Sequence, residues 1–130
     1  MTDTNPSHDL LAAAMRSLDT AITAARPTEK FAAAHLAALR AAAALLAATT
    51  RPSSRRPTSV WTLLSRVAPD CADWAAYFAA GATKRALAEA GVHSAVSERE
   101  ADDLLRGAHE FINMVADRLG MTRQMTLTAS

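Results

Sequence analysis

The amino-acid sequence predicts an all-α fold, namely an up-and-down four-helix bundle. Half of the 130 residues are hydrophobic, and alanine, the strongest helix former, supplies an unusual share of them. The chain has only four glycines, and its apolar residues recur at the spacings of three and four that are typical of helices. No segment competes as a strand. Because each alanine buries little surface, we expect stability to come from close approach of the helices rather than from bulky side chains.

The first helix is predicted to begin at Ser7 or His8 and to end near Ala25. Asp9 falls in its first turn, where a negative charge suits the helix dipole. The apolar positions predict one seam that faces one or two partner helices. These positions are Leu11, Met15, Leu18, Ile22 and Ala25.

The second helix is predicted to begin at Thr28, whose hydroxyl suits an N-cap. It carries two apolar stripes, and such a helix is usually central in a bundle or buried in an oligomer interface. His35 and Arg40 interrupt the apolar run, and we expect both at the rim of the core, with their polar ends reaching past it. The first stripe is Phe31, Ala34 or His35, Ala38, Ala42, Leu45 and Ala48, and the second is Leu36, Leu39, Ala43 and Leu46.

Residues 49–59, TTRPSSRRPTS, predict a basic linker between the second and third helices. The third helix is expected to start after Ser59 as its N-cap. Its apolar stripe continues through Pro69, which predicts a kinked or broken helix with one inward face. Gly81 is expected at a tight contact or a second bend, and Gly91 at the stop. The stripe is Val60, Leu63, Leu64, Val67, Cys71, Trp74, Phe78 and Ala82.

The fourth helix has the strongest start signal, because Ser97 and Glu100 form the pattern of a capping box. Gly120 is expected to end it. Its buried stripe is Leu104 or Leu105, Ala108, Phe111 or Ile112, Val115 and Leu119, and the outer-face pairs are Asp102 with Arg106, Arg99 with Asp103, and Arg106 with Glu110.

The totals predict one domain over residues 1–130, with residues 1–7 and 121–130 mobile. The net charge is +1. Cys71 is the only cysteine, and a single cysteine fits a reducing cytoplasm and excludes an intramolecular disulfide. The start of the chain lacks the order of a signal peptide. The most apolar run, Ala41–Ala48, is shorter than the roughly 20 residues that cross a bilayer. We expect a soluble, cytoplasmic protein without membrane contact.

Candidate chemistry is sparse in this sequence. His109 follows Arg106 at the Glu-x-x-His spacing of di-metal bundles, but without the acid. Cys71 lies in an apolar stripe, and the scattered glycines form no phosphate loop. We therefore expect no metal, no cofactor and no catalytic set. A cluster of cations could contact nucleic acid or phosphate, or could simply be a solvated linker. It comprises Arg51, Arg55 and Arg56, with Lys84 and Arg85 joining it in space.

Parts of three predicted elements resemble the HEPN superfamily (higher eukaryotes and prokaryotes nucleotide-binding). Residues 34–46, AHLAALRAAAALL, resemble its second-helix pattern, in which a histidine-containing alanine-rich turn leads to a basic residue and a closing Ala-Leu-Leu. The linker, the Ser-Val-Trp at 59–61 with Leu63 and Leu64, and the start of the last helix at 99–102 are similar to a small actinobacterial branch. The likeness spans about residues 10 to 119.

The resemblance implies a helical bundle, commonly a homodimer, in a superfamily of RNA-cleaving toxins and of inactive partners or regulators. Cleaving members carry an arginine and a histidine separated by four to six residues. Here Arg85 and His93 are separated by seven residues, and His109 is separated from Arg99 by nine and from Arg106 by two. The resemblance therefore carries over no catalytic residue.

Three functions remain open from the sequence. The first is a non-catalytic, homodimeric interaction or regulatory module that binds another macromolecule, with His35, Arg40 and His109 as polar residues of its cleft. The second is a divergent ribonuclease that uses His109 or His93 with a nearby arginine. The third is a nucleic-acid or nucleotide binder that uses the cation cluster.

Overall fold

The computed structural model describes residues 5–49 and 59–120, and this part of the chain is entirely helical, without a strand. The all-α prediction is confirmed. Six α-helices and two 3₁₀ turns follow one another in the described residues: α1 (Pro6–Thr23), α2 (Pro27–Thr49), α3 (Val60–Val67), η1 (Pro69–Cys71), α4 (Ala72–Ala80), α5 (Ala82–Glu89), η2 (His93–Ala95) and α6 (Glu98–Arg118).

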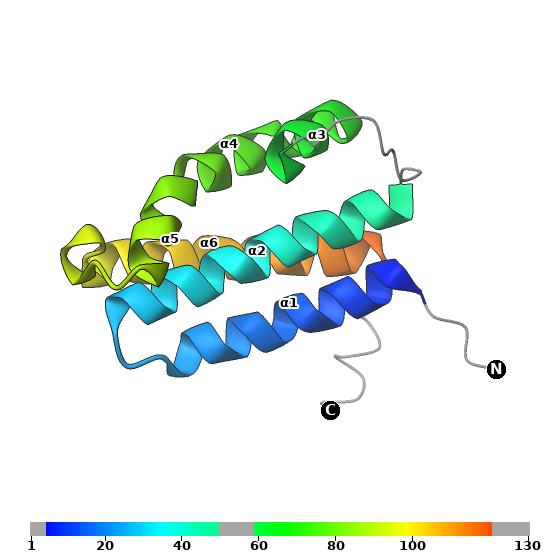
Figure 1. Cartoon of the computed structure of the whole chain (residues 1–130). Coiled ribbons are helices and arrows are strands. Elements are labelled where there is room, and N and C mark those ends of the chain that lie inside the picture. The colour runs from blue at the N-terminus through cyan, green and yellow to red at the C-terminus, as the bar shows by residue number, and fades with distance from the viewer. Residues whose placement is uncertain (1–4, 50–58, 121–130) are drawn as a thin grey trace.

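Helix α2 is the central element of the fold. It packs against α1, α3, α5 and α6, and Figure 1 shows it between α1 on one side and the α3–α5 segment on the other. The first predicted stripe of α2 is buried apart from Ala48, which is exposed. Six alanines of α2 have no exposed surface at all: Ala34, Ala37, Ala38, Ala41, Ala42 and Ala44. Neighbouring backbones can therefore lie close to α2 on several sides.

By length and composition alone, α2 could also cross a membrane. Its most apolar 18-residue window has a mean hydropathy of 1.7, but 56% of that window is buried within the protein. Core helices of soluble proteins have the same character, because packing against other helices demands apolar surface. We therefore attribute the hydrophobicity of α2 to its central place in the fold.

Helix α1 differs from its prediction in the face that it buries. Asn5 is its N-cap, accepting hydrogen bonds from the amides of Ser7 and His8, and the helix ends at Thr23. The predicted seam is wrong in its second half, because Ile22 is 57% exposed and Ala25 is exposed. Small residues share the buried face with two leucines, since they can approach the alanines of α2: Ser7, Leu11, Ala14, Ser17, Leu18 and Ala21.

The predicted third helix is three helices. Ser59 caps α3, its Oγ lying 3.2 Å from the amide of Trp61, and the chain breaks at Pro69 as predicted. Gly81 ends α4 and starts α5, so the predicted second bend is a full separation of two helices. The count of four helices is therefore too low for the described residues. The cause is the pair of breaks at Pro69 and Gly81, which divide one continuous apolar stripe among three helices.

Helix α6 begins with the predicted capping box, in which the amides of Ser97 and Glu100 each bond the other's side chain at 2.9 and 3.1 Å. Gly91 and Gly120 take the left-handed backbone conformation that favours glycine, with φ of 84° and 74°. Arg99 lies 4.0 Å from Asp103, as predicted. The pairing of Asp102 with Arg106 is wrong, because Asp102 bonds Lys30 of α2 at 2.8 Å.

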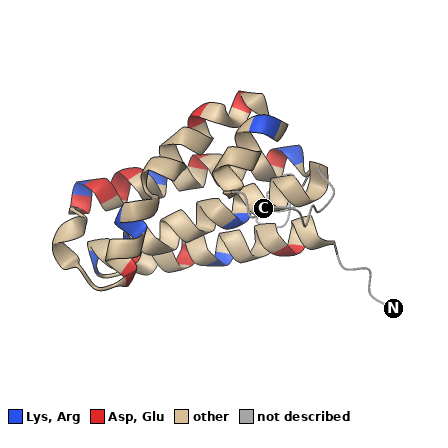
Figure 2. Cartoon of the chain, turned by 45° about the horizontal axis from the view of Figure 1, so that its top comes forward, with Lys and Arg blue, Asp and Glu red and all other residues tan. Residues whose placement is uncertain are grey.

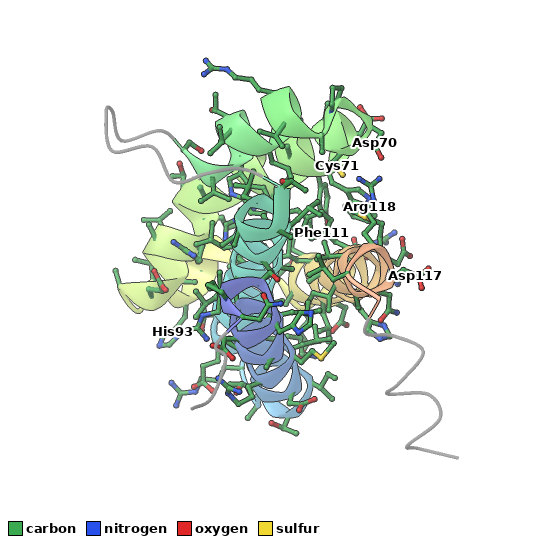
Figure 3. The ribbon with its side chains drawn as sticks, turned by 90° about the vertical axis from the view of Figure 1, so that its right-hand side faces the viewer. Asp70, Cys71, His93, Phe111, Asp117 and Arg118 are labelled. Atoms are coloured by element: carbon green, nitrogen blue, oxygen red, sulfur yellow. The ribbon has the colours of Figure 1, made fainter. Side chains whose placement is uncertain are left out.

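An aromatic cluster fills the space where α3, α4 and α6 meet. Phe78 lies at its centre, with ring centroids 5.2 Å from Trp61, 5.7 Å from Trp74 and 5.3 Å from Phe111. Figure 3 shows Phe111 reaching from α6 into the middle of the protein, while Arg118 at the end of the same helix pairs with Asp70. The large side chains are thus gathered on one side of α2, away from α1.

Enlarging a buried alanine of α2 should therefore destabilise the protein. We expect Ala38→Leu to lower the free energy of unfolding by about 1–3 kcal/mol, because no space exists beside a fully buried alanine. Urea unfolding measures the change. Ala76→Leu, at an exposed site of α4, is the control and should stay within about 0.5 kcal/mol of the unmodified chain. Equal effects of the two substitutions would contradict close packing around α2.

Candidate functional site

The predicted cation cluster is only partly placed. Arg51, Arg55 and Arg56 lie outside the described residues. Lys84 and Arg85 lie on α5, where each has an acidic partner: Lys84 bonds Glu100, and Arg85 Nε is 3.7 Å from Glu89 Oε1. The bond from Lys84, with help from the Ser97 amide, lowers the pKa of Glu100 to about 2. The two cations of α5 are thus engaged within the fold.

His35 is buried, so the rim position predicted for it is wrong. Only 1% of the residue is exposed, and its Nε2 lies 2.7 Å from the Phe78 carbonyl oxygen. Nε2 therefore carries the proton, and Nδ1, which has no partner among the described residues, is left as an acceptor. The Phe31 ring stacks on the imidazole at 6.3 Å. Burial lowers the pKa of His35, the bond to Phe78 opposes this, and Arg85 adds to the lowering.

The other predicted cleft residues have different surroundings. Arg40 is half-buried and donates from Nη1 to Ser17 Oγ at 2.7 Å, which joins α2 to α1. His109 is exposed on α6, one turn beyond Arg106, whose Nη1 bonds Asp103 at 3.1 Å. No hydrogen bond joins any two of His35, Arg40 and His109 within the part of the chain that the structure describes, and their common cleft stays a prediction.

Cys71 and the acidic side chains of the described residues form neither a reactive thiolate site nor a metal site. Cys71 is 1% exposed, as expected for a core position, and burial raises the pKa of its thiol. The reactive thiolate is therefore disfavoured. Among the described residues, His, Cys, Asp and Glu nowhere gather in a group of three that could hold a metal ion.

Arg26 and His93 line one cavity, which no pattern in the sequence predicts. The cavity has a volume of about 340 Å³ and is lined by Arg26, Pro27, Thr28 and His93. It lies where the chain passes from α1 into α2 and where η2 precedes α6. Arg26 and His93 are both exposed. Their separation along the chain carries no motif, so only the fold brings this arginine and this histidine together.

The outer face of α2 is a second candidate surface, formed by Ala32, Leu36, Leu39, Ala43 and Ala47. The first four are half-buried and Ala47 is exposed, so most of the predicted second stripe lies at the surface of the described chain. Ala32 and Leu39 pack partly against the core, whereas Leu36 and Ala43 are not among the partly buried residues that do so. Figure 2 shows how few charged residues α2 carries, whereas charges gather at the end where α5 meets α6.

An open cavity of about 590 Å³ adjoins the first half of this outer face. Its lining from α2 includes Ala32, Ala33 and Leu36, while Thr20 and Thr23 of α1 and the two alanines that follow this helix line the other side. Glu29 and Glu89 are its only charged lining residues within the described chain. Small side chains leave this hollow, and they would allow a further helix to approach closely.

Comparison with family models identifies the family to which this all-helical chain belongs. The model of the SAV_6107-like HEPN family matches residues 21–116, which is more than half of the chain. The chain belongs to this family, and the predicted superfamily membership is confirmed. No curated protein and no solved structure matches the chain.

The burial of His35 predicts a dependence of stability on pH. Because the folded-state pKa of His35 is lowered, the unfolded chain binds a proton that the folded chain refuses, and stability falls as the pH drops below about 6.5. We expect His35→Gln, which cannot titrate but can still donate to Phe78, to lose less unfolding free energy than the unmodified chain between about pH 7 and 5.5.

Chemical unfolding at a series of pH values measures this difference. His109→Gln makes the same chemical change at an exposed site and is the matched control. The titration of Glu100, whose pKa is about 2, falls below this window. An unchanged pH dependence in His35→Gln would show that the buried imidazole is not its source.

Proposed function

We propose that this HEPN protein is a non-catalytic module that forms a homodimer through the outer face of α2 and regulates or binds another macromolecule in the cytoplasm. The observation that carries the proposal is the apolar outer face. Monomeric proteins rarely leave a long apolar helix face uncovered, and such patches usually mark interaction sites. A second copy of the chain is the simplest partner, because small residues on both copies would let the two helices approach closely.

The charges beside the outer face fit a twofold arrangement of two copies. Glu29 is exposed, Arg40 is half-buried, and they lie about three turns apart along α2. In an antiparallel pairing of two α2 helices, Glu29 of each copy would approach Arg40 of the other copy. A twofold interface needs this kind of self-complementarity, because every contact between a residue of one copy and a residue of the other copy occurs a second time with the two copies exchanged.

The arrangement of the histidines supports a role without catalysis. His35 is buried in the core. His109 lies on α6 one turn from Arg106, which is already bonded to Asp103. An arginine and histidine at the spacing of the cleaving members are missing from the sequence. The absence of a prearranged acid and base on α6 favours a binding role for this helix.

Changing Leu36 should separate the proposed dimer into monomers. Leu36→Glu places a charge on the outer face at a half-buried residue that is not among those packed against the core, so we expect a folded chain whose dimer dissociation constant is raised at least about 100-fold. Sedimentation velocity measures the oligomeric state, and circular dichroism checks the fold. Leu87→Glu, at a 42% exposed position of α5, is the matched control and should remain dimeric. A strictly monomeric unmodified chain would refute the proposal.

One observation favours a second candidate, a divergent ribonuclease, since His93 shares a cavity with Arg26. If the chain does cleave RNA, we expect His93→Ala to lower the rate by about 100-fold or more, because histidine would act as the general acid or base. His109→Ala is the control. If the chain is the non-catalytic module, single-stranded RNA incubated with the purified protein will remain intact on a denaturing gel.

A further inference from the structure

The start of α2 offers unpaired hydrogen-bond donors at the cavity that Arg26 and His93 line. In this 23-residue helix, Lys30 is the first residue whose amide bonds back, to the Arg26 carbonyl at 2.9 Å. The amides of Thr28 and Glu29 have no acceptor among the described residues, since no side chain caps them. Unpaired amides and the helix dipole together give such a helix start a partial positive charge.

One cation, Arg26, lines this cavity, and no acid of the described residues does. Arg26 and His93 face it from two segments that are distant in the sequence, and its lining holds no carboxylate from the described residues. The nearest acid along the chain, Glu29, lines the other cavity, beside the outer face of α2. The electrostatic character of the Arg26 and His93 cavity therefore suits an anion.

Thr28 is the independent observation that points to a ligand. It lines the cavity although only 4% of the residue is exposed, and its hydroxyl has no hydrogen-bond partner in the described chain. Among the described residues, the fully buried side-chain nitrogen and oxygen atoms that lack a hydrogen-bond partner are His35 Nδ1 and Arg85 Nε alone. The Thr28 oxygen is not one of them, so part of it is accessible, and Thr28 itself lines the cavity. A buried polar group without a partner is costly unless a ligand or water satisfies it.

We propose that Arg26, Thr28 and His93, with the free amides at the start of α2, bind a phosphate group, either as inorganic phosphate or as a small phosphomonoester. A guanidinium presents paired donors that match phosphate oxygens, and the hydroxyl and imidazole each add one donor. At about 340 Å³, the cavity has room for a phosphate and for a short group that carries it. The site lies at the turn between α1 and α2, shares no lining residue with the outer face, and is formed within one copy of the chain, so it does not depend on dimerisation.

Phosphate titration of the isotope-labelled full chain tests the proposal by nuclear magnetic resonance. In a buffer with about 0.1 M salt, which screens unspecific attraction, inorganic phosphate should cause saturable shifts of the amide signals of Thr28 and Glu29. A Kd near the millimolar range is expected for an open site of this size. Glycerol 3-phosphate is the phosphomonoester probe and glycerol its uncharged control. Tighter binding of glycerol 3-phosphate than of phosphate would identify the phosphomonoester as the fitting ligand.

Substitutions then locate the site. We expect Arg26→Gln to weaken phosphate binding about tenfold and Thr28→Val about threefold or more, because each removes a donor to a charged ligand. Thr28→Ser keeps the hydroxyl and should bind within about twofold of the unmodified chain. Arg16→Gln removes the same charge from an exposed position of α1 and is the control for net charge.

Two outcomes would overturn the site. One is equal weakening by Arg16→Gln and Arg26→Gln, which would mean unspecific attraction by net charge. The other is the lack of saturable shifts at Thr28 and Glu29 up to about 20 mM phosphate. Should Thr28→Val alter the fold, His93→Gln, at an exposed position, provides the second measurement, with an expected loss of about threefold or more. Sedimentation of the same samples shows separately whether the dimer forms.

Discussion

Close packing of small side chains against α2 is the constraint on which the rest of the structure depends. Six alanines of this helix are completely buried, and α1 meets them with a face on which alanine and serine alternate with leucine. Alanine contributes little buried area by itself, so the stabilisation comes from many contacts at short range between helix backbones. Helices that must lie this close have little freedom to shift or rotate.

The opposite side of α2 packs against large aromatic side chains instead of small ones. There His35 is surrounded by the rings of Phe31, Trp61 and Phe78, and a methyl group at Gly81 would lie 3.3 Å from His35 Cδ2. The glycine thus serves two needs, since it ends α4 and leaves room for the imidazole. Large rings and one hydrogen-bonded histidine hold the short helices α3, α4 and α5 to a helix that is otherwise lined with alanine.

The sequence predicted those features that rest on local interactions. The Ser59 cap, the capping box at Ser97 and the break at Pro69 each depend on a few neighbouring residues, and each is found in the structure. The helical class followed from long, strongly periodic segments, whereas the family was suggested by the resemblance of residues 34–46 and of shorter segments to its known patterns. The predictions that failed concern which neighbour a side chain meets. Large residues such as Ile22 were assigned to the seam of α1, whereas small residues make it.

The candidate site was harder to predict than the fold. His35 was placed at the rim because a polar residue in an apolar run usually reaches water, but the Phe78 carbonyl, 43 positions away, satisfies it inside the core. Arg26 and His93 share no motif, and their meeting depends on how the turn before α2 lies against the turn before α6. Juxtapositions of this kind are set by tertiary packing, so a single sequence carries no direct signal for them.

Glu100 has a consequence for how this protein opens locally. Its carboxylate bonds the Ser97 amide within the capping box and also Lys84 of α5. One side chain therefore stabilises the first turn of α6 and holds the preceding helix beside it. Fraying of either segment breaks a bond of this shared carboxylate, so amide hydrogen exchange near Lys84 and in the first turn of α6 should be linked rather than independent.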